Sequence, residues 1–284
     1  MKITPKLRYR YLLAAMVALS GVCSQSASAA SVAPPADLAD WVCTGSCGSL
    51  AQDGDVTLSP LGNAKYGYVS TGYSEAFGVS PLSLSDNKVG AETNGSRIVS
   101  GAFSANADDS LNIQFNFVST DGNGYDDYAW ARVVNAGDNS LVAWIFTARA
   151  TNSGSNKIIP GDVVGSAEFN PRDTLTNYAD YEFNSKTADW SALGSSNNIC
   201  WQTDAKGCGY TGWLESSFKF AQTGSYKLEI GVTNWGDTAY DTGLAFDFQN
   251  LNDSRIAAPV PEPGSASLFL AGLCLLGVAA YRRS

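Results

Sequence analysis

The sequence predicts an all-β fold, a jelly-roll-like β-sandwich, with an N-terminal signal helix before it and a C-terminal transmembrane helix after it. The 284 residues include 28 glycines, 11% aromatic residues and only 16% charged residues, a composition typical of turn-rich β proteins. Between the two ends, no window keeps an apolar period of 3.6 residues, whereas short alternating segments recur between clusters of turn residues.

The N-terminal segment has the order of features found in a secretory signal peptide. Its basic side chains are Lys2, Lys6, Arg8 and Arg10. An apolar run from Tyr11 to Val22 follows, and then the small residues Ala27-Ser28-Ala29. We therefore expect a signal peptide over residues 1–29 that is cleaved near Ala29. The alternative, an uncleaved anchor, is disfavoured because the run is far shorter than the ~20 residues of a spanning helix.

Residues 30–259 are predicted to form one exported β-sandwich domain, since that length suits a single all-β core. The clearest strands alternate apolar and polar residues, and they cover 111–117, 226–232 and 244–248. In the first of them, Leu111, Ile113, Phe115 and Phe117 are expected to face inward. The nearly all-apolar segment 141–148 predicts a central strand covered on both faces. Weaker strand patterns cover 64–71, 97–103, 128–134 and 213–220, and long loops are expected within 151–200.

The charge balance excludes several classes of function. The chain has no histidine, with 18 basic against 27 acidic residues and a formal net charge of −9. Without histidine there is no Ser-His-Asp or Cys-His catalytic group and no histidine-ligated metal. An acidic chain offers no basic patch to neutralise phosphates, so nucleic acid is not an expected partner.

The cysteines predict disulfides in an oxidising compartment. Of the six cysteines, the four that lie between the terminal segments are Cys43, Cys47, Cys200 and Cys208. Four cysteines allow three connectivities. We favour Cys43–Cys47 and Cys200–Cys208, because each pair closes a short loop that contains glycine. The alternative is a zinc site, which is disfavoured because thiolates oxidise outside the cytoplasm.

One loop has the residue types of a calcium site. Asp121, Asn123, Asp126 and Asp127 alternate with glycine, and calcium prefers six to eight oxygen ligands on a flexible loop. The loop begins like an EF-hand but lacks its helices and its distal glutamate. The alternative interpretation is a hairpin turn rich in Asx residues. No other cofactor is expected.

Two further residue sets are candidates for contact with a glycan. Asp237 and Asp241 have the residue type of a glycosidase acid/base pair, although acidic residues on a glycine-containing loop more often form turns or bind cations. The aromatic side chains that fall in loops or at strand ends are Trp190, Trp201, Tyr210, Trp213 and Trp235. Such rings can stack on sugars, and the alternative for each is packing within the fold.

The C-terminal segment, residues 260–284, has three parts in a fixed order. Pro261-Glu262-Pro263 is stiff and cannot continue a helix. An uncharged stretch from Ser265 to Ala280 follows, and then Arg282 and Arg283. The stretch is long enough to span a membrane with its flanks, and the arginines are expected to stay in the cytoplasm.

This tripartite end resembles the PEP-CTERM sorting signal of Gram-negative bacteria. The resemblance implies an exosortase as the processing partner, with Pro261, Glu262 and Pro263 recognised and Arg282 and Arg283 acting as the stop. It also implies anchoring in the inner membrane before processing and then a place at the cell surface or in the extracellular matrix. The segments 125–133, 213–220 and 243–248 are similar to exported β-sandwich modules of many PEP-CTERM proteins, and that likeness brings no catalytic residues.

The sequence therefore predicts a non-enzymatic surface or matrix protein, and the resemblance implies an association with exopolysaccharide or biofilm. The alternative hypothesis is a secreted glycan-acting hydrolase that uses a carboxylate pair.

Overall fold

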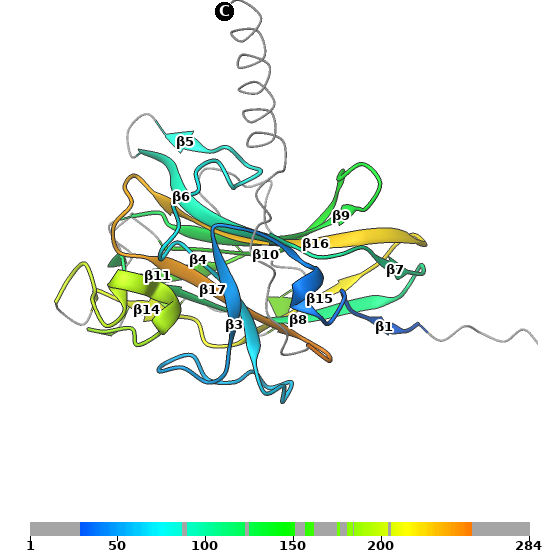
Figure 1. Cartoon of the computed structure of the whole chain (residues 1–284), viewed down its shortest axis with the longest axis horizontal. Helices are drawn as coiled ribbons and strands as arrows, with labels where there is room; N and C mark the ends of the chain where they lie inside the picture. Colours follow the sequence, from blue (N-terminus) through cyan, green and yellow to red (C-terminus); the bar gives the residue numbers. More distant parts are fainter. Residues whose placement is uncertain are drawn as a thin grey trace, which may run out of the picture.

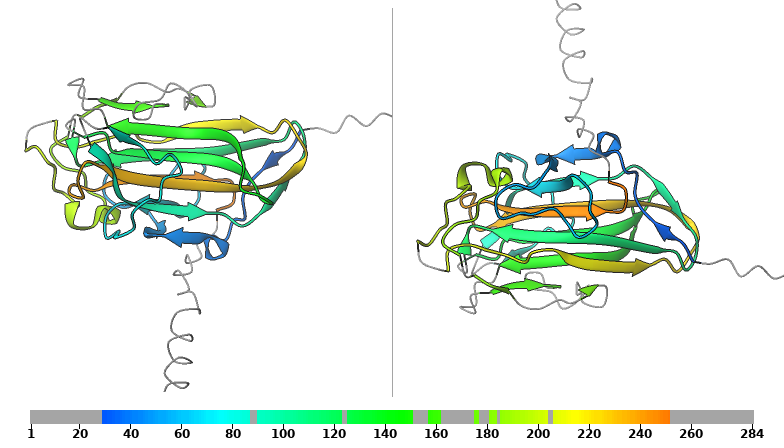
Figure 2. Two further views of the ribbon diagram at one scale, coloured as in Figure 1. Left: turned by 90° about the horizontal axis from the view of Figure 1, so that it is seen from above. Right: turned by 90° about the horizontal axis from the view of Figure 1, so that it is seen from below.

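The chain folds into two β-sheets that pack face to face. The computed structural model describes residues 29–86, 90–122, 125–150, 157–161, 175–176, 181–183, 185–203 and 206–251. Figure 1 shows the two sheets as stacked layers, and Figure 2 shows their long strands running along the long axis of the body. The predicted all-β sandwich is confirmed.

The first sheet has eight strands in the described part of the chain. In spatial order its main path is β12 (Leu175–Thr176), β15 (Leu214–Lys219), β8 (Ser110–Ser119), β17 (Thr242–Phe248), β4 (Tyr66–Ser70) and β3 (Ser46–Leu50), with β1 (Ser31–Val32) and β14 (Gly209–Tyr210) also pairing with β8. The β1–β8 pair is parallel, and β15, β17 and β14 pair with β8 in the antiparallel sense.

The second sheet has nine strands in the same described ranges. Its path is β13 (Tyr181–Glu182), β11 (Lys157–Pro160), β10 (Leu141–Ala150), β9 (Tyr128–Asn135), β16 (Gly224–Trp235), β6 (Gly90–Val99) and β2 (Val42–Thr44), with β5 (Ser85–Asp86) beside β6 and β7 (Phe103–Ala105) beside β16. Successive strands such as β8 and β9, or β16 and β17, lie in different sheets, so the chain crosses the sandwich repeatedly.

The main core lies between the sheets and is formed by the inward positions of alternating strands. Leu111, Ile113, Phe115 and Phe117 of β8 are all buried in it, as their alternation predicts. Phe115 stacks on Phe146 of the facing sheet, with ring centroids 4.5 Å apart. Because successive side chains of a strand point to opposite faces, the other residues of these strands lie on the outer faces of the sheets.

Those outer faces are also covered over part of their area. On the first sheet, a second buried cluster joins Val118 and Ala245 to Trp190 and Leu193, which lie at the 3₁₀ segment η4 (Ser191–Ser196). On the second sheet, a third cluster joins Tyr128, Trp130 and Trp235 to Val79. A shorter 3₁₀ segment, η1 (Leu38–Asp40), lies before β2. The extra layers explain why polar residues of β8, such as Asn116, are buried as well.

The predicted strands are confirmed, and one detail of their burial is corrected. Each predicted segment contains a strand. The segment 64–71 contains β4, 97–103 joins the end of β6 to the start of β7, and 128–134 lies in β9. The segment 213–220 contains β15, 226–232 lies in β16 and 244–248 lies in β17. The segment 141–148 forms β10, but Leu141 is 47% and Val142 is 37% exposed, so the strand is covered on both faces only beyond this end. Among the described residues, no helix is long and apolar enough to span a membrane. Both predicted terminal helices lie outside the described residues.

Candidate functional site

Loops from distant parts of the chain meet at the end of the sandwich that carries η4, drawn yellow-green in Figure 2. The amide of Thr71 donates to the carbonyl of Thr242 at 2.9 Å, and that of Thr120 donates to the carbonyl of Asp241 at 3.2 Å. Trp201 N in turn donates to Thr120 O at 2.9 Å. These bonds hold the segments after β4, between β8 and β9, after η4 and between β16 and β17 in one cluster.

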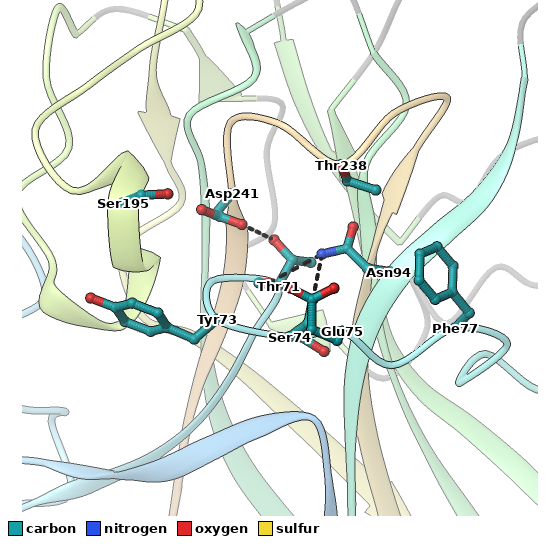
Figure 3. Close-up of a pocket in the computed structure, with 9 residues that line it drawn as sticks. All are labelled: Thr71, Tyr73, Ser74, Glu75, Phe77, Asn94, Ser195, Thr238 and Asp241. Atoms are coloured by element: carbon teal, nitrogen blue, oxygen red, sulfur yellow. Dashed lines mark hydrogen bonds between the residues drawn. The ribbon is translucent and has the colours of Figure 1, made fainter.

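A polar pocket of about 320 Å³ opens among these loops (Figure 3). Its size lies at the lower end of the range of small-molecule sites, roughly 300–1,000 Å³. The lining residues are Thr71, Tyr73, Ser74, Glu75, Phe77, Asn94, Ser195, Thr238 and Asp241. Glu75 and Asp241 are carboxylic acids, and neither lysine nor arginine is among the described residues of the lining, so this lining is acidic.

The floor of the pocket is held by hydrogen bonds among its own residues. Asn94 Nδ2 donates to the carbonyls of Thr71 and Ser74, at 3.4 and 3.0 Å. The Ser74 hydroxyl donates to the carbonyl of Gly95, and Asn94 Oδ1 accepts from Asn234 Nδ2 at 3.2 Å. The floor is therefore a fixed polar surface whose buried groups already have partners.

Two aromatic rings stand at the rim, on opposite sides of this floor in Figure 3. The Tyr73 side chain is 80% exposed and that of Phe77 is 64% exposed. Among the described aromatic residues, these are the two most exposed to solvent. Large apolar side chains are normally buried, so their joint exposure at one polar pocket makes it the candidate binding surface.

Asp241 lies at the edge of the floor with both carboxyl oxygens engaged. Thr71 Oγ1 donates to its Oδ1 at 3.0 Å, and Ser196 Oγ donates to its Oδ2 at 2.7 Å. Burial raises the pKa of this carboxyl, and the two hydroxyl hydrogen bonds partly oppose the rise. Asp237, its predicted partner, is not among the lining residues, and its Oδ1 accepts from Ala239 N at 2.8 Å.

Behind the pocket, carboxyl groups of the predicted calcium loop are buried. Asp121 is 0% exposed, and neither of its oxygens has a hydrogen-bond partner in the described structure. Burial raises the pKa of Asp121, and the charge of Asp127 raises it further. Asp127 Oδ1 accepts from Trp235 N at 2.8 Å and its Oδ2 from Thr242 Oγ1 at 2.6 Å. These bonds lower the pKa of Asp127 without cancelling the rise that burial causes.

The other members of the predicted calcium loop are placed differently or lie beyond the described residues. Asp126 pairs with Arg149 Nη1 at 2.9 Å, which directs its carboxylate to a cation of the protein itself. Asn123 is outside the described residues. Within the described ranges, no group of three or more acidic or cysteine side chains is arranged to hold a metal ion. Calcium binding therefore stays a prediction.

The predicted sugar-stacking aromatics separate into buried and exposed rings. Trp235 is 1% and Trp190 is 0% exposed, so both rings pack within the fold. The predicted contact of Trp235 with a sugar is therefore wrong. Trp213 donates its Nε1 to Thr57 O at 3.0 Å and packs edge-on against the Tyr66 ring. Trp201 and Tyr210 are 38% and 37% exposed, but neither lines the pocket; their contact with a glycan stays a prediction.

Both predicted disulfides are confirmed. Cys43 bonds to Cys47 and Cys200 to Cys208, with Cα atoms 6.1 and 5.5 Å apart. The second disulfide closes the loop that lies against the segment after β8: a Cβ added to Gly122 would lie 3.4 Å from Gly207 O. It therefore stabilises the loops beside the candidate site.

Sequence reasoning missed the residues that form the rim. Tyr73 and Phe77 lie in a segment without strand alternation, between glycines at positions 72 and 78. The signal available was that two aromatics sit among turn residues, where no core face requires them. The pocket also needs Ser195 and Thr238, which are far away in the sequence.

The fold and the pocket define an all-β sandwich protein with an acidic, aromatic-rimmed site among its end loops. The family model of the PEP-CTERM protein-sorting motif matches residues 259–284. The chain therefore has a PEP-CTERM sorting motif at this position, and the motif supports export and recognition by an exosortase. No curated protein and no solved structure matches the chain.

Proposed function

We propose that this protein is exported through its N-terminal signal peptide, processed by an exosortase and retained, without enzymatic activity, at the cell surface or in the extracellular matrix. The observation that carries the proposal is the match of residues 259–284 to the sorting motif. Pro261, Glu262 and Pro263 are the recognition residues, and Arg282 and Arg283 are the stop. Exopolysaccharide of the matrix is the proposed partner of the β-sandwich.

Two features of the β-sandwich support this destination. The disulfides Cys43–Cys47 and Cys200–Cys208 suit an oxidising compartment outside the cytoplasm. The acidic chain, with its net charge of −9, favours a soluble surface and disfavours docking on anionic lipid.

A non-enzymatic role is supported by the state of the acidic residues. Both oxygens of Asp241 accept hydrogen bonds from neighbouring hydroxyls, and Asp237 lies outside the pocket lining. The chain also lacks histidine, the most frequent general acid or base. The alternative, a glycan hydrolase, would use a different pair of carboxylates, because Glu75 and Asp241 line the same pocket.

The sorting proposal is tested by Glu262→Ala in a host that contains the exosortase, with Ser265→Ala as the control variant next to the motif. The wild-type chain and the control are expected to lose their C-terminal end, as measured by intact mass. The Glu262→Ala chain is expected to keep its full C-terminus and to accumulate in the inner-membrane fraction. Equal processing and equal location of all chains would contradict the proposal.

The enzymatic alternative is tested on the same proteins with neutral and acidic polysaccharides. We expect no release of reducing ends. Hydrolysis that is lost in Glu75→Gln or Asp241→Asn would show a hydrolase and overturn the non-enzymatic role.

A further inference from the structure

The polar pocket has two aromatic rings at its rim, and both point away from the core. Tyr73 has a φ of 62° and Gly194 has a φ of 60°. The left-handed region is unfavourable for a bulky residue such as tyrosine and is seen mainly at turns and functional sites. A Cβ added to Gly194 would lie 3.1 Å from Tyr73 Cε2, so the ring rests against the bare backbone of this glycine in η4. The tyrosine is therefore fixed in an exposed position before any ligand arrives.

The polar groups that remain for a ligand are mainly hydrogen-bond acceptors and hydroxyls. Thr71, Ser74 and Asn94 use their side chains within the floor. Glu75, Ser195 and Thr238 are exposed. Each oxygen of Asp241 accepts one side-chain hydrogen bond and keeps capacity for another, since a carboxylate has about four acceptor positions.

The charge of the described lining disfavours anionic ligands. An anionic ligand would meet Glu75 and Asp241 with no compensating lysine or arginine among the described lining residues, and like charges in a partly buried site repel. A purely apolar ligand would leave the polar floor without water or partners. A ligand that fits both rim and floor has flat apolar faces and many hydroxyl donors.

We propose that this pocket binds a neutral saccharide chain, with the Tyr73 and Phe77 rings packing on the C–H faces of sugar residues and Glu75 and Asp241 accepting hydrogen bonds from sugar hydroxyls. A pyranose ring has an apolar face of C–H bonds, which packs against the electron-rich face of an aromatic ring. Its hydroxyls donate to carboxylates in charge-assisted hydrogen bonds, which are stronger than neutral ones. The inference rests on the proposed function for its setting, because it makes this pocket the contact with matrix polysaccharide.

The experiment measures binding of the full-length protein in detergent to soluble polysaccharides by affinity electrophoresis and calorimetry. The neutral probes are dextran, a mixed-linkage β-glucan and galactomannan; the charged probes are polygalacturonate and chitosan oligomers. We expect binding to at least one neutral probe, and Phe77→Ala and Tyr73→Ala are each expected to weaken it by about tenfold or more, as for aromatic anchors of other interfaces. Val42→Ala, which shortens a side chain that is 67% exposed and outside the pocket lining, is the control and is expected to bind like the wild type.

Melting curves of all variants accompany the binding data, and Phe77→Ala is the decisive variant because its side chain is exposed and not at a positive φ. Several results would overturn the proposal: no binding to any neutral probe, equal binding by the Phe77→Ala protein, or an equal loss of binding in the Val42→Ala control. Preference for polygalacturonate or for chitosan would assign an anionic or a cationic ligand instead. Because processing at Glu262 is measured separately, a failure of glycan binding is distinguishable from a failure of sorting.

Discussion

Replacing Asp121 with asparagine tests the electrostatics behind the pocket. Asp121 is fully buried, its oxygens have no hydrogen-bond partner within the described residues, and burial with the neighbouring Asp127 raises its pKa. In the unfolded chain, an aspartate ionises with a pKa of about 3.9. Between that value and its raised native pKa, the folded protein holds a proton that the unfolded chain has lost. Stability therefore falls as the pH rises above about 4.

The magnitude follows from the width of this pH window. Each pH unit over which the native state holds one extra proton lowers the free energy of unfolding by about 1.4 kcal/mol. From pH 4 to pH 7 the loss is on the order of 4 kcal/mol. For a domain of this size it corresponds to a fall in Tm of roughly 8–16 °C. The Asp121→Asn protein has a neutral side chain of the same shape, so it lacks this contribution.

The assay is thermal and urea unfolding between pH 4 and pH 8 in buffer that contains a chelator. Wild type and Asp121→Asn are expected to be similar at pH 4 and to diverge steadily, with the variant more stable at pH 7. Asp138→Asn is the charge-matched control: Asp138 is exposed, and the Ser140 amide lowers its pKa, so its removal leaves the downward slope intact. If the stability of wild type and that of Asp121→Asn changed in parallel from pH 4 to pH 8, the reasoning would be refuted.

Three further outcomes follow from the same structure. Added calcium at about 1 mM, the affinity range of extracellular calcium modules, is predicted to raise the Tm of the wild type at pH 8 but not that of Asp121→Asn; an unchanged wild-type Tm would remove the predicted site. Replacing Cys200 and Cys208 together by alanine is expected to cost about 2–3 kcal/mol in urea unfolding, and equal midpoints would contradict it. Gly231→Ala would place its Cβ 2.1 Å from Trp130 Cζ2, so a loss of about 2 kcal/mol and a Tm lower by about 4–8 °C are expected; an unchanged Tm would show that the tryptophan moves freely.

The strands could be predicted because their signal is local. The alternation of residues 111–117 fixes which side chains face the core, and β8 follows it. The disulfides could also be predicted, because each joins cysteines that are close in sequence. The burial of Asn116 was not predictable in this way, because it depends on the layer around η4, which arrives from a distant part of the chain.

The site was mostly hidden from sequence reasoning for the same reason. Asp241 was identified as a candidate from its loop, but its partners Thr71 and Ser196 lie 170 and 45 residues away along the chain. Trp235 looked available because it stands at a strand end, yet its ring is buried beneath the segment around Val79. Tyr73 and Phe77 carry no periodic pattern, and only the folded structure places both at one pocket.

The most direct test of the whole account is the intact mass and the thiol content of the protein recovered from two hosts, one with and one without the exosortase. The account predicts a chain that lacks its leader and has both disulfides in each host. Its C-terminal end is expected to be trimmed near Pro261-Glu262-Pro263 only where the exosortase is present. A full-length chain in the cytosol with free thiols, in either host, would contradict export and sorting together.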